Sequence, residues 1–107
     1  MAITNTRITT AISPTTVFTA VGQQAITVMY ICNTDSSQPA NVSVYCIDSS
    51  TSTGAGEDNC IYSDLAILQG DTYVMDLEKL ILDNGDMIDV ESNAGNVITV
   101  TVSSISV

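Results

Sequence analysis

Apolar side chains alternate with threonine, serine and other polar residues along most of the chain, which is the period-two pattern of a β-strand. No stretch has a clear helical period, and Thr, Val and Ile, which suit a pleated sheet, recur throughout. Turn-forming residues divide the alternating segments. The pattern predicts strands over residues 3–12, 15–19, 25–32, 40–48, 60–68, 72–77, 87–91 and 97–107.

Residues 78–82 do not fit this pattern. They are compatible with a single helical turn or with an irregular crossover between sheets, and the sequence does not decide between them. The Asn84-Gly85 pair that follows is a strong signal for a hairpin turn, because these two residues tolerate a positive φ.

The segment 25–32 is apolar on both of its predicted faces. One face carries Met29 and Ile31, and the other carries Ile26, Val28, Tyr30 and Cys32. A strand of this kind is expected in the middle of a sheet, with both faces covered by the core or by a neighbouring subunit.

About eight short strands separated by turns are typical of a sandwich or a small barrel. We therefore predict an all-β fold, an antiparallel β-sandwich of jelly-roll or immunoglobulin-like type, that forms one domain over residues 1–107. A chain of this length can bury a core of its own, which here is mainly aliphatic because there are only five aromatic residues.

The chain is strongly acidic, with a net charge of −10, and ten of its twelve acidic residues lie between Glu57 and Glu91. This charge repels nucleic acids and anionic membranes, so neither is expected as a partner. We expect no secretory signal, because no apolar segment follows a basic start, and no run is long enough to span a membrane.

The chain contains no histidine and only two basic residues, Arg7 and Lys79. Histidine is the usual acid or base near neutral pH, and neither a nucleophile motif nor a phosphate-binding glycine loop is present. The three cysteines lack metal-site spacing and are expected as free thiols. We predict a protein that is not an enzyme and that has no catalytic residues and no cofactor.

The acidic residues Asp83, Asp86 and Asp89 are the only candidates for a metal site, since Ca²⁺ takes clustered carboxylate oxygens. Their spacing differs from that of an EF-hand loop, and a hairpin flanked by solvated acids accounts for the same residues. No metal is therefore expected.

Threonine and serine occupy many outward positions where Lys or Glu is more common, and an uncharged face is cheap to desolvate against another protein. Interface residues are expected at Met29, Ile31, Tyr45 and Val107. We predict a homo-oligomer, with a trimer as one arrangement. The alternative is a monomeric sandwich whose two sheets cover segment 25–32.

The order of these segments resembles that of small virion structural proteins of tailed bacteriophages, especially those of marine and cyanobacterial hosts. The resemblance is carried by ITNTRITT, by ITVMYICNTDSSQPANVSVYCID, by LAILQGDTYVMDLEKLILDNGDMIDVES and by the final VITVTVSSISV. These are patterns of strands and turns and include no catalytic motif.

The resemblance implies a capsid decoration (cement) protein that stabilises the particle, with other capsid, neck or tail proteins as partners. It would be assembled in the host cytoplasm and reside in the virion. The alternatives are a neck, tail or fibre component, or an adhesion module that binds carbohydrate or depends on Ca²⁺.

Overall fold

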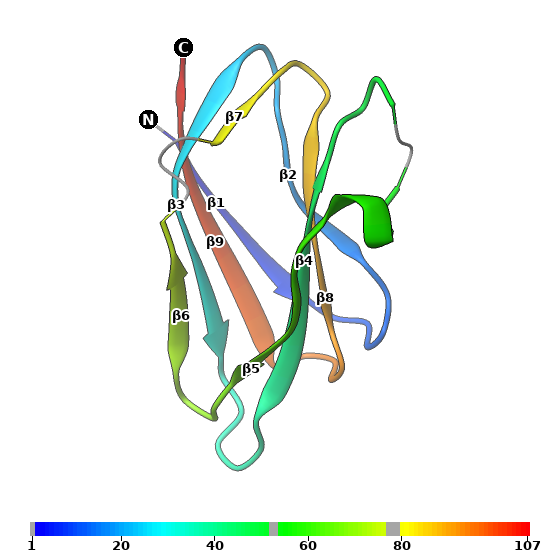
Figure 1. Ribbon diagram of the computed structural model, residues 1–107. Coiled ribbons are helices and arrows are strands. Elements are labelled where there is room, and N and C mark those ends of the chain that lie inside the picture. The colour runs from blue at the N-terminus through cyan, green and yellow to red at the C-terminus, as the bar shows by residue number, and fades with distance from the viewer. Residues whose placement is uncertain (1, 52–53, 77–79) are drawn as a thin grey trace.

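The computed structural model describes residues 2–51, 54–76 and 80–107. The strands form two antiparallel sheets that pack face to face as a β-sandwich (Figure 1), so the predicted fold class is confirmed. The strands are β1 (Ala2–Ile8), β2 (Thr15–Thr19), β3 (Gln24–Asn33), β4 (Ala40–Ile47), β5 (Cys60–Ile67), β6 (Thr72–Met75), β7 (Leu80–Leu82), β8 (Met87–Ser92) and β9 (Ile98–Ser106). A short 3-10 helix, η1 (Glu57–Asn59), precedes β5.

The first sheet has the strand order β1-β9-β3-β6, and β7 also pairs with β3. β6 lies along residues 29–32 of β3, whereas β7 lies along residues 24–26, so the two short strands share one side of β3. β3 is therefore an interior strand, as its apolar sequence predicts, between β9 on one side and β6 with β7 on the other.

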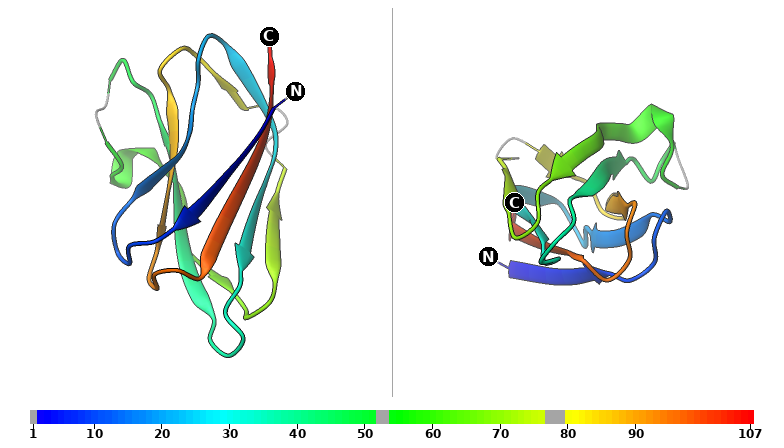
Figure 2. Two further views of the ribbon diagram at one scale, coloured as in Figure 1. Left: turned by 180° about the vertical axis from the view of Figure 1, so that it is seen from behind. Right: turned by 90° about the horizontal axis from the view of Figure 1, so that it is seen from below.

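The second sheet has the order β2-β8-β4-β5. The chain crosses between the sheets at several connections, among them the one from β1 to β2 and the turn from β5 to β6 (Figure 2). β5 and β6 lie at the same open side of the sandwich, at the borders of their respective sheets.

The structure adds one strand to the eight that the pattern predicts. Leu80–Leu82 pairs with β3 as β7, where the sequence left open a helical turn or a crossover; residues 77–79 lie outside the described part of the chain. A three-residue strand is too short to display an alternating pattern, and β7 depends on its partner strand for stability.

The core between the sheets is aliphatic and is filled by inward-facing residues of both sheets, border strands included. Met29 and Ile31 of β3 meet Val100 and Val102 of β9 on this inner face. Ile26 is buried with them and does not share a face with Val28, because the register against β9 shifts between these two residues. A β-bulge of this kind reverses the side to which the following residues point.

The chain leaves the first sheet earlier than the pattern suggests. β1 ends at Ile8, and residues 9–14 turn toward β2. Ile12 adopts a φ of 56°, which is unusual for a β-branched residue, and its backbone N–H donates to the carbonyl of Ser92. This contact joins the turn to the end of β8.

The described part of the chain holds no helix with the length and apolar character that a membrane crossing requires.

Candidate functional site

The first sheet contains no acidic residue in any of its five strands, although the chain has twelve. Arg7 in β1 is the one charged residue in these strands, and its guanidinium donates a hydrogen bond to the carbonyl of Asn96. The strands of the second sheet include Asp64, Asp89 and Glu91. Within the strands, acidic residues are therefore confined to the second sheet.

The outward side of the first sheet consists of the residues that alternate with the buried ones. It is called the uncharged face below, because its strands carry no carboxylate and Arg7, at the β1 border, is their one charged residue. Across its middle, Val74, Tyr30, Thr101 and Asn5 lie opposite one another on β6, β3, β9 and β1. Val74 is 53% exposed and Tyr30 is 42% exposed. The Thr101 hydroxyl donates to the Asn5 side-chain oxygen at 2.9 Å, so neighbouring polar groups on this face are partly paired.

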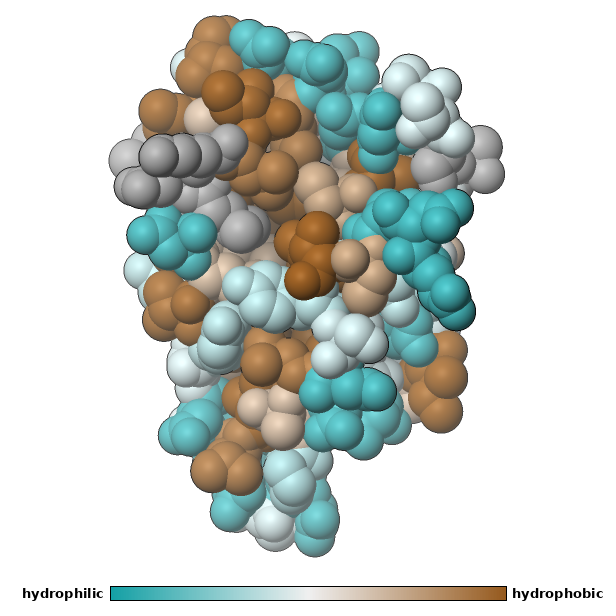
Figure 3. Space-filling model, in the orientation of Figure 1, coloured by the Kyte–Doolittle hydropathy of each residue, from teal (hydrophilic) through white to brown (hydrophobic). Residues whose placement is uncertain are grey.

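Hydrophobic residues gather at one end of this sheet. Figure 3 shows them around β7, the beginning of β3 and the end of β9. Ile81 of β7 and Ile105 of β9 lie opposite Ala25 of β3, one on each side. Val21 precedes β3 and Val107 follows β9 in the chain, and both side chains are exposed. Together with Tyr30 and Val74 they make this face apolar as well as free of carboxylates. A surface of this type is commonly a protein contact site.

Two of the four residues expected at an interface lie elsewhere. Met29 and Ile31 are buried in the core, because the inner face of β3 packs against the second sheet; the outward residues of the same segment are Val28, Tyr30 and Cys32. Val107 is exposed and its N–H donates to the carbonyl of Gln23.

The fourth expected residue, Tyr45, lies half-buried on the second sheet. Its hydroxyl donates to the Glu91 carboxylate at 3.2 Å. Burial and the neighbouring negative charge of Glu91 raise the pKa of Tyr45, so its hydroxyl stays protonated at neutral pH. Tyr45 is thus part of the acid-bearing layer.

The candidate metal ligands are spread over the β7–β8 turn and β8. The Asp86 carboxylate accepts hydrogen bonds from the Ser49 N–H, the Ser49 hydroxyl and the Asp83 N–H, at 2.9 to 3.1 Å. Asp83 accepts a hydrogen bond from the Gln23 side chain. These contacts tie the turn to neighbouring loops, and within the described residues no group of three or more His, Cys, Asp or Glu could hold a metal ion.

Asp89 is separated from this turn and lies on β8, between Thr16 of β2 and Tyr45 of β4. It is only 7% exposed, and its Oδ1 atom has no hydrogen-bond partner among the described residues. One buried carboxylate without further ligands does not make a cation site.

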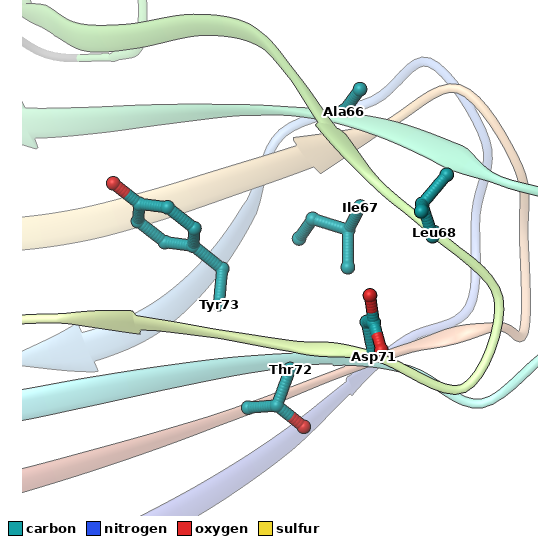
Figure 4. Close-up of a pocket in the computed structure, with 6 residues that line it drawn as sticks. All are labelled: Ala66, Ile67, Leu68, Asp71, Thr72 and Tyr73. Carbon is teal, nitrogen blue, oxygen red and sulfur yellow. The ribbon is translucent and has the colours of Figure 1, made fainter.

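A shallow pocket of about 240 Å³ opens where β5 turns into β6 (Figure 4). In this view the Asp71 side chain points across the gap toward Ile67, and the Thr72 hydroxyl points away from it. The lining residues are Ala66, Ile67, Leu68, Asp71, Thr72 and Tyr73. Pockets for small-molecule ligands usually start at about 300 Å³, so this one does not suit a cofactor or an oligosaccharide.

An aromatic pair that sequence reasoning missed closes the open side of the sandwich beside this pocket. The rings of Tyr62 on β5 and Tyr73 on β6 meet edge to face, with 6.0 Å between their centroids. Tyr62 has a raised pKa because of its hydrogen bond with Tyr73. The pair links the border strands of the two sheets, and it forms because β6 pairs with β3 while β5 pairs with β4.

A second pocket, of about 340 Å³, lies between the end of β4 and η1 and is lined by Cys46, Asp48, Thr51, Asp58 and Asn59. Burial, with a smaller effect of Asp86, raises the pKa of the Cys46 thiol. A thiol of raised pKa is a poor nucleophile near neutral pH. The pocket therefore offers carboxylates without an activated reacting group.

No known protein family, curated protein or solved structure matches this chain. The resemblance to bacteriophage virion proteins therefore stays a prediction. The uncharged face is the best candidate for a functional site, and its chemistry suits contact with another protein.

Proposed function

We propose that this protein is a non-enzymatic structural component of a bacteriophage particle, a capsid decoration protein that binds shell proteins through its uncharged face. The observation that carries the contact role is the exclusion of all acidic residues from the strands of one sheet in a chain of net charge −10. Desolvating such a face leaves no carboxylate unpaired. The virion setting is supported by the resemblance of the strand pattern alone.

The non-enzymatic part of the proposal is supported by the lack of suitable groups. The chain has no histidine. The thiol of Cys46 beside the larger pocket has a raised pKa, which keeps it protonated. Turnover of a small compound by the pure protein, lost when one carboxylate is neutralised, would contradict this part.

The contact role can be tested by adding one carboxylate to each sheet in turn. Val74→Asp places a charge on the uncharged face, whereas Asn41→Asp adds the same charge at an exposed position of β4. We expect both variants to fold, because both positions are exposed. Particles of the phage that encodes the chain should retain the wild type and Asn41→Asp after a salt wash and should lose Val74→Asp.

Fractionation of such particles also tests where the protein sits. Recovery with shells supports the decoration role, and recovery with necks, tails or fibres transfers the same contact role to those assemblies. Equal retention of Val74→Asp and the wild type would show that the uncharged face is not the contact. Complete absence from particles would refute the virion role.

The proposed adhesion alternative would need a ligand site on the acidic side or at the β5–β6 pocket. A rise in melting temperature with Ca²⁺ or with a simple sugar would favour it, because a ligand that binds only the native state stabilises that state. The scattered carboxylates and the small pocket give this alternative less support.

A further inference from the structure

Each sheet of the sandwich has two border strands, and exposed strand edges invite pairing with other chains unless something blocks them. In the second sheet both borders carry such blocks. β2 follows Pro14 and has a bulge between Thr16 and Phe18. β5 has two register shifts against β4 and holds Asp64 at a φ of 52°, so its edge is neither flat nor uncharged.

The β6/β7 border of the first sheet is blocked in a different way. β6 has four residues and β7 has three, and residues 76–79 separate them. Asp71 and Asp76 flank β6 on either side in the chain. A long ladder cannot form along an edge that is interrupted and bounded by carboxylates.

β1 has neither a bulge nor a carboxylate, and its one charged residue is Arg7. Its seven residues pair with β9 in unbroken register, from Ala2 opposite Ser104 to Ile8 opposite Ile98. It contains no proline and no acidic residue. Figure 2 shows β1 at the border of its sheet, and β9 is its one strand partner among the described residues. Half of its backbone hydrogen-bonding groups therefore face away from the sheet.

We propose that β1 pairs with β1 of a second copy of this chain, so that two first sheets join into one continuous sheet. The pairing is antiparallel about a two-fold axis at Asn5, which makes the contact self-complementary. A seven-residue ladder is about 24 Å long, which predicts a small interface and a reversible dimer.

The side chains of β1 suit this register. Thr4 lies opposite Thr6 of the partner subunit, and such hydroxyl pairs favour cross-strand contact. Ile3, which is 67% exposed, lies opposite Arg7 of the partner subunit, whose aliphatic stem can cover it. The two Asn5 amides meet at the axis.

Charge favours β1 over the other borders of this molecule as the place where a second copy binds. Two chains of net charge −10 repel each other, and the repulsion is strongest where carboxylates face one another. When two β1 strands pair, no acidic residue of one copy faces an acidic residue of the other within the paired strands. The joined sheet also doubles the uncharged face without covering it, although the dimer does not depend on the proposed virion role.

Analytical ultracentrifugation of the purified protein tests the dimer directly. We expect a concentration-dependent dimer for the wild type and at least about tenfold weaker association for Asn5→Asp, because like charges opposite each other are destabilising. The Asn5→Asp substitution keeps the oxygen that accepts the Thr101 hydrogen bond, so the fold should persist. Val74→Asp, on the opposite border of the same sheet, is the matched control and should dimerise like the wild type.

A cysteine pair supplies a second measurement of the register. Asn5→Cys should give a disulfide-linked dimer under mild oxidation, since the two substituted positions would face each other at the axis, and Val74→Cys should not. A wild type that stays monomeric at the highest attainable concentration would overturn the inference. A dimer that is lost in Val74→Asp but kept in Asn5→Asp would also overturn it, because this result would place the dimer contact on the uncharged face and not on the β1 edge. Neither result would affect binding to particles, which tests the proposed function separately.

Discussion

At the scale of single residues, Asn33 at the end of β3 shows how one buried polar side chain holds several segments together. Its amide donates to the carbonyls of Gln38 and Ile67, each at 3.0 Å, and its side-chain oxygen accepts from the Asp35 N–H. It is fully buried and lies where the β3–β4 loop approaches the end of β5. A buried amide with these bonds satisfied fixes the loop geometry.

Replacing Asn33 by alanine should lower the free energy of unfolding by roughly 2–4 kcal/mol, because the Ile67 carbonyl loses its buried donor and two further bonds are lost. Urea unfolding followed by circular dichroism measures the change. Gln69→Ala, at an exposed position of the nearby β5–β6 turn, is the control and should cost little. Equal stability of the two variants would contradict the role given to Asn33.

A second residue-scale prediction concerns Asp48, whose pKa is lowered by hydrogen bonds from the Ser50 hydroxyl and the Ser50 N–H. A carboxyl with a pKa lowered by folding stabilises the native state above its unfolded pKa, and this stabilisation is lost as pH falls through the folded pKa. Ser50→Ala should therefore raise the pKa of Asp48 and weaken the pH dependence of stability in that acid range. Carbon NMR titration of the Asp48 carboxyl checks this, with Ser49→Ala as a control that leaves the pKa unchanged.

At the scale of elements, much of the fold follows from the alternating pattern alone. β2 has the predicted bounds, and β4 and β9 lie within the predicted segments 40–48 and 97–107, because alternation is clear where solvent covers one face of a strand. The side of Ile26 was predicted wrongly because a bulge depends on the partner strand. From the sequence, the uncharged face could be predicted only as a surplus of Ser and Thr at outward positions. The sequence does not show which strands share this face, because these strands are far apart in the chain.

The connection between β1 and β2 gives a prediction about packing. A Cβ atom on Gly95, in the β8–β9 turn, would lie 2.9 Å from the backbone oxygen of Thr9. Gly95→Ala should therefore cost about 1–3 kcal/mol, since the backbone must shift to relieve the overlap. Gly56→Ala is the matched control. Apart from its two neighbours in the chain, no described atom lies within 4 Å of the added methyl group, and the extended backbone at this position suits any residue. Thermal unfolding of both variants measures the difference; similar melting temperatures would refute the close approach.

At the scale of the whole molecule, the absence of carboxylates from the strands of the first sheet predicts how contacts respond to salt. Binding through the uncharged face should change little between about 0.05 and 0.5 M NaCl, and self-association should strengthen as repulsion is screened. A basic partner held by the acidic residues would instead dissociate as the NaCl concentration rises. Sedimentation and binding measurements over this range distinguish these responses, and weaker self-association at high salt would contradict the prediction for the dimer.

The absence of carboxylates from one sheet also affects how the molecule travels. The strands of the first sheet hold no carboxylate, whereas those of the second hold Asp64, Asp89 and Glu91, so the negative potential is weaker over the middle of the uncharged face. Near a negatively charged body, repulsion is then lowest when the uncharged face approaches first. Orientation during diffusion and the final contact would then select the same side of the protein.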